Sequence, residues 1–203
     1  MNTLWLFKKN RDVKNKPDKS IKIGRADIIL PADHMLDVYM KSYPRYDQAL
    51  GEIARIMYQR LALFNAIDIG ANVGDSAALM CKYQSIPVLC IEGCDVFLPY
   101  LQKNASIIGN HIKVAEYFVG AQSTNVDCAL VDVQRGTASI AQKYLPAKQD
   151  TLIEQKAAVK TLDDILREHE SFRNAALIKI DTDGYDFLII LHALDCFKKC
   201  LPV

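Results

Sequence analysis

A glycine-containing turn between an apolar run and a run of small residues is the feature that most constrains the fold. The sequence NAIDIGANVGDSAAL, residues 65–79, passes from apolar residues through Asp68 to Gly70 and Gly74, and then into residues that suit a helix. A strand, a tight turn and a helix in this order begin a βαβ unit, in which crossover helices join parallel strands. Such turns hold adenosine-containing cofactors at the carboxyl end of the strand.

The apolar runs that follow predict a parallel sheet with helices between its strands. Continuous apolar segments occupy residues 65–69, 87–92 and 112–120, and their lack of polar alternation is typical of strands buried on both faces. Residues 75–84 and 94–109 lie between them and suit crossover helices, which gives a βαβαβ pattern. Upstream, residues 47–64 carry apolar side chains at helical spacing.

The second half of the chain is less regular. The segments CALVDVQ and AAVKT, within residues 121–160, are possible short strands, but this region gives no firm assignment. Thr161 is the predicted N-cap of a helix that starts TLDDILREH; AALIKID predicts a further buried strand and YDFLIILHAL a further helix. We therefore predict an α/β fold with a doubly wound, Rossmann-like sheet, in which residues 1–46 form an N-terminal extension packed on a domain of residues 47–203.

Composition narrows the classes of partner. The chain has 25 Lys plus Arg and 24 Asp plus Glu, so its charge does not indicate binding to nucleic acid or to an anionic membrane. It contains no apolar run of the ~20 residues that cross a bilayer and no signal peptide, which predicts a cytoplasmic protein. The cysteines, with no zinc or thioredoxin spacing, are expected to be reduced thiols.

The residues of the glycine turn indicate which cofactor it holds. The turn lacks the G-x-G-x-x-G pattern of dinucleotide-binding proteins, and Asn72 stands at a position where its tolerance of positive φ allows a tight turn. Asp68 would repel a pyrophosphate, whereas S-adenosylmethionine carries an ammonium and a sulfonium. Glu92, after the second strand, is placed to bind ribose hydroxyls. The alternative is that Asp68 caps the turn and Glu92 is exposed at a strand end.

Three segments together resemble the FkbM-type methyltransferases: AIDIGANVGDSA, TLDDIL and LIKIDTDGYDFLIIL. The resemblance covers roughly residues 28–203, although Asp183 and Asp186 stand where the family commonly has glutamates. It implies a class I methyltransferase sheet of order 3-2-1-4-5-7-6, S-adenosylmethionine as methyl donor, and a hydroxyl acceptor on a sugar, glycan or natural product. The implied cofactor-binding residues are Asp68, Gly70, Asn72, Gly74, Asp75 and Glu92, with Glu92 at the ribose; Asp181 would face the methyl group.

Asp181 and Asp183 are the candidate catalytic residues. They follow a buried strand, and one of them could accept the hydroxyl proton of the acceptor. Asp183 could instead cap the helix that begins near Gly184. Lys179 is expected on the same side of the strand as Asp181, where it could orient that carboxylate or extend toward solvent. We predict no metal, because DTDGYD lacks the order of a calcium loop, and the four histidines are expected at surface or partly buried positions rather than as bases.

Two other functions remain open at this point. A nicotinamide-dependent dehydrogenase is disfavoured by the glycine spacing and by Asp68, whereas an inactive S-adenosylmethionine-binding domain is a serious alternative. The final LPV resembles the start of a fifth strand, so we expect the last strands of the family fold to be missing. The strand at 176–181 would then be an open edge that favours self-association, with weak cofactor binding and little or no activity.

Overall fold

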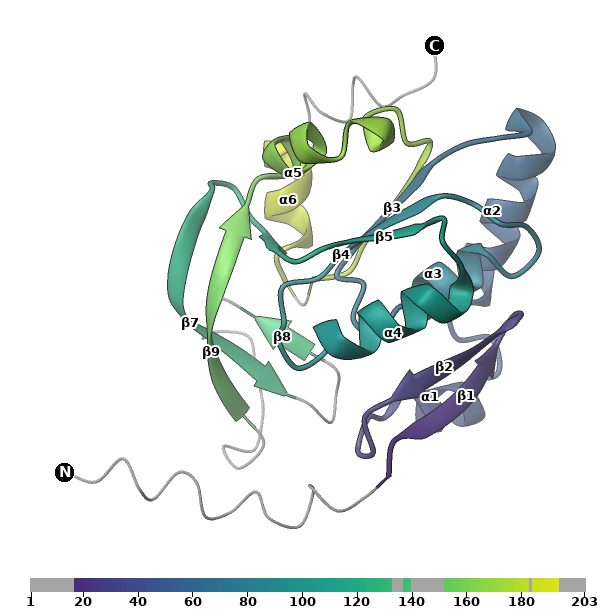
Figure 1. Cartoon of the computed structure of the whole chain (residues 1–203), viewed down its shortest axis with the longest axis horizontal. Coiled ribbons are helices and arrows are strands. Elements are labelled where there is room, and N and C mark those ends of the chain that lie inside the picture. Colours follow the sequence, from purple (N-terminus) through teal and green to yellow (C-terminus); the bar gives the residue numbers. More distant parts are fainter. Residues whose placement is uncertain (1–16, 133–136, 140–151, 183, 194–203) are drawn as a thin grey trace.

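The centre of the molecule is a four-stranded parallel sheet. The computed structural model describes residues 17–132, 137–139, 152–182 and 184–193. Its central sheet has the strand order β10-β3-β4-β5 (Figure 1). The strands are β3 (Ala66–Ile69), β4 (Val88–Ile91), β5 (Ile112–Ala115) and β10 (Leu177–Ile180). This order confirms the predicted α/β, Rossmann-like class and matches the first four positions, 3-2-1-4, that the resemblance implies.

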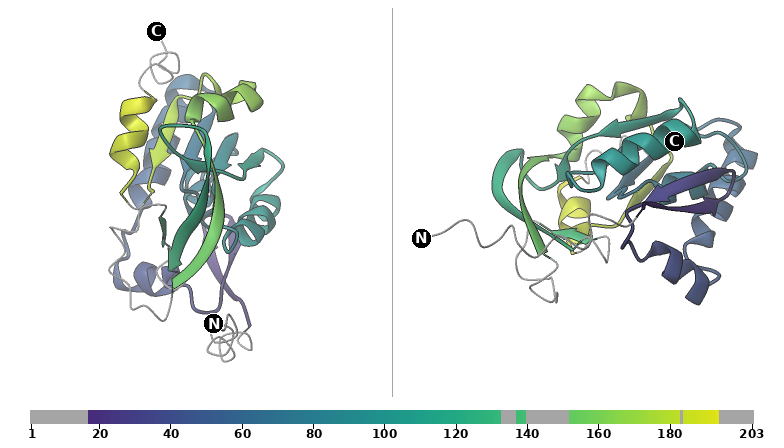
Figure 2. Two further views of the ribbon diagram at one scale, coloured as in Figure 1. Left: turned by 90° about the vertical axis from the view of Figure 1, so that its left-hand side faces the viewer. Right: turned by 60° about the horizontal axis from the view of Figure 1, so that its bottom comes forward.

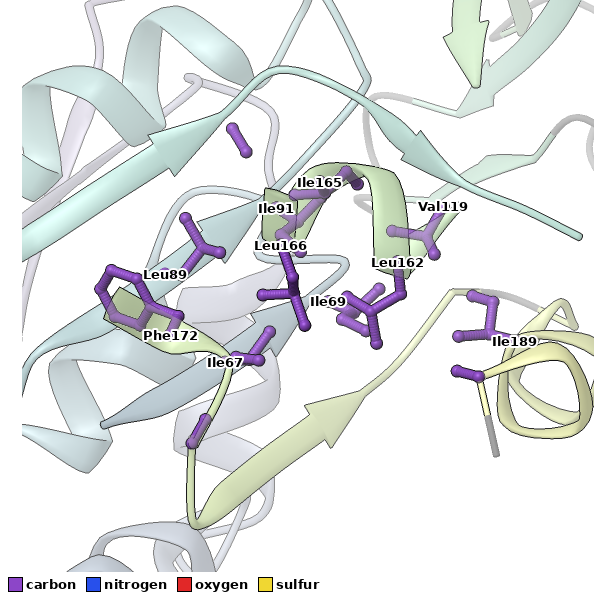
Figure 3. Close-up of a cluster of buried hydrophobic side chains, with 13 residues drawn as sticks. Ile67, Ile69, Leu89, Ile91, Val119, Leu162, Ile165, Leu166, Phe172 and Ile189 are labelled. Carbon is purple, nitrogen blue, oxygen red and sulfur yellow. The ribbon is translucent and has the colours of Figure 1, made fainter. Parts of the chain in front are cut away.

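Alternating side chains of these strands build two separate cores, as period two requires. Ile67 and Ile69 of β3 point to the face that α5 (Leu162–Glu168) covers, with the 3-10 helix Glu170–Phe172 and α6 (Asp186–His192) beside it (Figure 3). Ala66 points to the opposite face, where α2 (Gln48–Leu61), α3 (Asp75–Met80) and α4 (Leu98–Ile108) pack. Figure 2 shows α4, in teal, and α6, in yellow, on opposite sides of the sheet.

Each helix that the sequence predicts forms in the structure, whereas the helix over Leu36–Ser42 was not predicted. The side chain of Thr161 accepts a hydrogen bond from the backbone of Asp164 at 3.1 Å, which confirms the predicted N-cap of α5. The helix predicted over residues 75–84 is shorter and ends at Met80. No helix within the described ranges is both long and apolar enough to cross a membrane.

A second sheet, of order β6-β9-β7-β8, stands beside the first (Figure 1). Its strands are β6 (Phe118–Val119), β7 (Thr124–Asp132), β8 (Thr137–Ser139) and β9 (Leu152–Lys160). The prediction of one strand over 112–120 is therefore wrong, because β5 ends at Ala115 and β6 pairs with β9. The chain can change sheets here because Gly93 has no Cβ, which would lie 2.3 Å from the Phe118 ring.

The N-terminal part is an ordered layer on the α3–α4 side. It consists of a hairpin, β1 (Lys19–Ile23) and β2 (Ala26–Leu30), followed by α1 (Leu36–Ser42). Apolar side chains of the hairpin share a core cluster with α3 and with Phe97, the residue before α4. Asn104 of α4 joins the layers: its side-chain amide donates to the carbonyls of Ile29 and Val73 and accepts from the Ile29 N–H. The boundary predicted at residue 46 stays a prediction.

Candidate functional site

A cleft of about 350 Å³ opens where β3, β4 and β10 end. The carboxyl ends of parallel strands are where α/β sheets bind their ligands, because the loops there diverge to opposite faces. The first half of the cleft wall comes from the turn after β3 and from Glu92 after β4. The second half comes from the end of β10 and from the N-terminal layer. The lining includes the predicted residues Gly70, Asn72, Asp75, Glu92 and Asp181.

The turn after β3 has a left-handed backbone at three positions. The φ angles are 75° at Gly70, 49° at Asn72 and 89° at Gly74, and the value at Asn72 confirms the expected tolerance of this conformation. At Gly70, an added Cβ would lie 1.9 Å from the carbonyl oxygen of Asp181. The turn can therefore approach the end of β10 only because this residue is glycine.

Glu92 holds the two adjacent loops together through its carboxylate. Oε2 accepts from the Asn72 N–H at 2.8 Å, and Oε1 accepts from the N–H groups of Gly93 at 2.9 Å and Cys94 at 2.8 Å. Glu92 is 6% exposed, so it is not the exposed strand-end residue of the alternative. Burial raises its pKa, and the backbone donors oppose that rise. A carboxylate has about four acceptor positions, so Oε2 retains room for a ribose hydroxyl.

Asp68 and Lys179 form an ion pair at the floor of the site. They are register partners on β3 and β10, and Lys179 Nζ lies 3.2 Å from Asp68 Oδ1. Asp68 is fully buried and its oxygens make no hydrogen bond of ordinary geometry. Burial raises the pKa of Asp68, while Lys179 opposes that rise. Asp68 does not belong to the cleft lining, whereas Lys179 does. Asp68 would therefore affect a bound ligand only indirectly, through its ion pair with Lys179.

Lys179 connects the turn after β3 to the candidate base. Its Nζ donates to the Gly70 carbonyl at 3.0 Å and lies 3.7 Å from Asp181 Oδ2, which places Lys179 and Asp181 on one side as their spacing predicts. Although burial disfavours the charged amine, the carboxylates of Asp68 and Asp181 raise the pKa of Lys179 above its ordinary value. The lysine therefore stays charged and orients Asp181.

The other predicted acids differ in their surroundings. Asp75, in the first turn of α3, lines the cleft, and burial raises its pKa to about 6. The Asp181 carboxylate is 67% exposed. Asp183 lies outside the described residues, so its two suggested roles stay predictions. Asp186 accepts from the backbone N–H and the hydroxyl of Thr182 at 2.7 and 2.9 Å, and thus organises the start of α6.

The N-terminal layer supplies site residues that the sequence analysis missed. His34 was expected at a surface or partly buried position, but it is 5% exposed and lines the cleft. Its Nδ1 accepts from the Leu36 N–H at 3.2 Å, which leaves Nε2 to donate to Asn72 Oδ1, also at 3.2 Å. Burial lowers the pKa of His34, so the ring is neutral and supports the turn. A contact across 38 residues leaves no local signal in the sequence.

Tyr39, Tyr46 and Asp47 also line the cleft. They come from α1 and from the segment that leads into α2. Asp47 adds a fourth carboxylate to those of Asp75, Glu92 and Asp181, and Lys179 is the one Lys or Arg among the described lining residues. Among the described side chains, no group of three His, Cys, Asp or Glu residues could hold a metal ion.

The residues of this cleft fit S-adenosylmethionine. The excess of carboxylates over amines favours its ammonium and sulfonium, the free acceptor position on Glu92 suits a ribose hydroxyl, and the glycine turn leaves its backbone open to the ligand. A pyrophosphate would meet the same carboxylates and be repelled. The geometry therefore supports the choice of cofactor made from the sequence.

Comparison with known proteins gives the family. Searches among curated proteins and among solved structures found no match. The family model described as the methyltransferase FkbM domain matches residues 68–203, which is more than half of the chain. The match begins at Asp68 and includes the glycine turn, Glu92, Lys179 and Asp181. The chain therefore belongs to the FkbM methyltransferase family and is an S-adenosylmethionine-dependent methyltransferase.

Proposed function

We propose that the chain methylates a hydroxyl oxygen of a sugar, glycan or natural product. The observation that carries the proposal is the position of Asp181. Its carboxylate is exposed at the end of β10, on the cleft, and is oriented by Lys179 at 3.7 Å. A hydroxyl needs a nearby base when it becomes a nucleophile, and an exposed carboxylate in a cleft can serve as one.

The proposed cofactor residues belong to the turn after β3, to the start of α3 and to the end of β4. Gly70, Asn72 and Gly74 would surround the methionine end, Asp75 would face its positive charge, and Glu92 would accept from the ribose. S-Adenosylmethionine supplies a methyl group that is already activated, so the work left to the protein is mainly positioning. Holding two reactants in line can contribute roughly 7 to 11 kcal/mol at the upper end.

In the proposed reaction, Asp181 accepts a proton and Lys179 orients Asp181. The acceptor oxygen bonds to the methyl carbon, and the hydroxyl proton passes to the Asp181 carboxylate. Lys179 fixes the direction of that carboxylate, because its Nζ is itself held by the Gly70 carbonyl. Asp181 then releases the proton to water, to which its side chain is exposed.

An Asp181→Asn variant tests this assignment. We expect S-adenosylmethionine affinity to stay within a few-fold, because Asp181 is placed at the acceptor, and the methyl-transfer rate to fall about 100-fold, as loss of a general base predicts. Calorimetry measures the first quantity and transfer of isotopically labelled methyl to hydroxyl acceptors measures the second. Asp163→Asn, on the outer surface of α5, is the matched control. Normal turnover by Asp181→Asn would show that the base lies elsewhere.

The same measurements separate the alternative functions. A chain that binds S-adenosylmethionine but transfers methyl to none of a broad panel of sugars and polyols would support the inactive cofactor-binding domain. Preferential binding of NAD would support the dehydrogenase. We expect NAD to bind far more weakly, because its pyrophosphate would approach Asp75 and Asp47.

A further inference from the structure

Helix α1 and the segment that leads from it into α2 form a wall of the cleft with both aromatic and acidic side chains. The rings of Tyr39 and Tyr46 stack with centroids 6.1 Å apart and an interplanar angle of 29°, and both residues line the cleft. Asp47 follows Tyr46 directly and lines the cleft as well. Asp75 and Asp181 line the same cleft, so this wall and the proposed base border one space.

Asp47 has an unusual backbone conformation for its position. It is the N-cap of α2, with φ at 51°, and its side chain makes no capping hydrogen bond. Aspartate at an N-cap normally accepts from the first turn of the helix, and a left-handed conformation is uncommon for residues other than glycine, although Asp and Asn adopt it more readily than most. Residues held in this way cluster at functional sites. Here the conformation leaves the carboxylate free of the helix and available to the cleft.

The charges around this wall are predominantly negative. The cleft is lined by the carboxylates of Asp47, Asp75, Glu92 and Asp181 and by one amine, that of Lys179, which is already paired with the buried Asp68. S-Adenosylmethionine carries a net charge of about +1, so the site stays negative with the cofactor bound. A carboxylate or phosphate on the acceptor would therefore be repelled by these carboxylates. Hydroxyl groups of the acceptor could instead donate hydrogen bonds to these carboxylates.

We propose that Tyr39, Tyr46 and Asp47 form the acceptor subsite and select the uncharged, polyhydroxylated face of a sugar. Tyr46 packs against the apolar face of the sugar ring, and Asp47 accepts from a hydroxyl next to the one that is methylated. The surplus negative charge excludes uronic acids and sugar phosphates. This inference rests on the proposed function, because it places the acceptor in the same cleft as Asp181.

Matched sugars that differ by one charge test the proposal. Saturation-transfer NMR compares methyl β-glucoside with methyl β-glucuronide, and methyl β-galactoside with methyl β-galacturonide, each with and without S-adenosylhomocysteine. We expect at least one neutral glycoside to bind, and its uronide to bind about tenfold or more weakly. Asp47→Asn should reduce the difference in affinity between the neutral glycoside and its uronide several-fold, and Tyr46→Ala should weaken binding of the neutral glycoside. Asp27→Asn removes the same charge on the exposed face of β2, outside the cleft lining, and should leave the affinities for the neutral glycoside and for its uronide unchanged.

Three results would overturn the subsite. The first is equal binding of a uronide and its neutral partner, the second is binding of no neutral glycoside in either series, and the third is an equal effect of Asp27→Asn and Asp47→Asn. Circular dichroism confirms that each variant is folded. Failure of the chain to bind S-adenosylhomocysteine would count against the proposed function alone, since the sugar titrations without it report on the subsite independently.

Discussion

At the scale of single residues, Gly70 shows how a loop sequence determines a site. Gly70→Ala would place a Cβ 1.9 Å from the Asp181 carbonyl, a backbone atom that cannot rotate away. We expect this variant to lose S-adenosylmethionine binding and to unfold at lower denaturant concentration. For unfolding alone, Gly74→Ala is the matched comparison, because it shares a positive φ but its Cβ would meet side chains rather than backbone, those of Leu101 at 3.1 Å and Asn104 at 3.9 Å. Equal unfolding free energies for the two variants would contradict the role of close approach.

Asp75 should make both stability and cofactor affinity depend on pH. Its pKa in the folded chain is about 6, above the ordinary 3.8, because burial disfavours the charge. A raised folded-state pKa means that its contribution to stability is complete below about pH 4 and is lost as pH rises through 6. Affinity for the cationic cofactor should change in the opposite direction and rise through the same range, since ionised Asp75 attracts the ligand.

Calorimetric titrations of S-adenosylmethionine between about pH 5 and 7.5 measure this dependence. Asp75→Asn should flatten the affinity profile, while Asp163→Asn on the surface should leave it as in the parent chain. A profile that keeps its slope in Asp75→Asn would assign the titration to another group, of which the buried Asp68 is the first candidate because burial raises its pKa too.

At the scale of helices and strands, local patterns predicted the parallel sheet and its crossover helices well. β3, β4 and β10 are short and predominantly apolar, with Asp68 and Lys179 as the interruptions, and helices pack on both faces of the sheet. Their sequences therefore carry the signal of strands in a covered parallel sheet. The run at 112–120 has a similar apolar sequence, but it supplies β5 to the central sheet and β6 to the second sheet. The sequence of the run does not show where the two strands separate, because the close approach of Phe118 to Gly93 involves a residue of another loop. The hairpin β1–β2 was not predicted, since its strands have only five residues each and the partners of its buried side chains lie on α3 and near α4.

Asn104 tests how strongly that hairpin is fixed. Its side chain is fully buried and makes hydrogen bonds to both Ile29 backbone groups and to the Val73 carbonyl, at 2.8 to 2.9 Å. Asn104→Leu keeps a similar volume but leaves these backbone groups without partners, which should lower the free energy of unfolding by about 2 to 5 kcal/mol. Lys103→Ala, at an exposed position of the same helix, should change it by about 0.5 kcal/mol or less. Chemical denaturation measures both.

At the scale of the whole molecule, the site combines residues that are close in sequence with others that are far apart. Gly70, Asn72 and Asp75 belong to one short motif, so their shared location could be predicted from the sequence. His34, Tyr39 and Tyr46 reach the cleft only because the N-terminal layer packs across α3 and α4, and no pattern within residues 34–46 records that contact. The acceptor side of the site depends on this tertiary arrangement more than the cofactor side does.

The packing leads us to expect that the N-terminal layer and the central sheet unfold as one cooperative unit. Ile28 of β2 and Ile165 of α5 are both fully buried, on opposite sides of the molecule. Replacing either by alanine should lower the free energy of unfolding by about 2 to 5 kcal/mol, within a single transition that S-adenosylmethionine shifts to higher temperature in both variants. Ile107→Ala, at a 42% exposed position of α4, is the control and should have little effect. Thermal unfolding followed by circular dichroism, with and without cofactor, measures the transitions. If the hairpin instead formed a separate unit, Ile28→Ala would produce an early transition that the cofactor does not shift, and His34 could then not support the turn that holds the ligand.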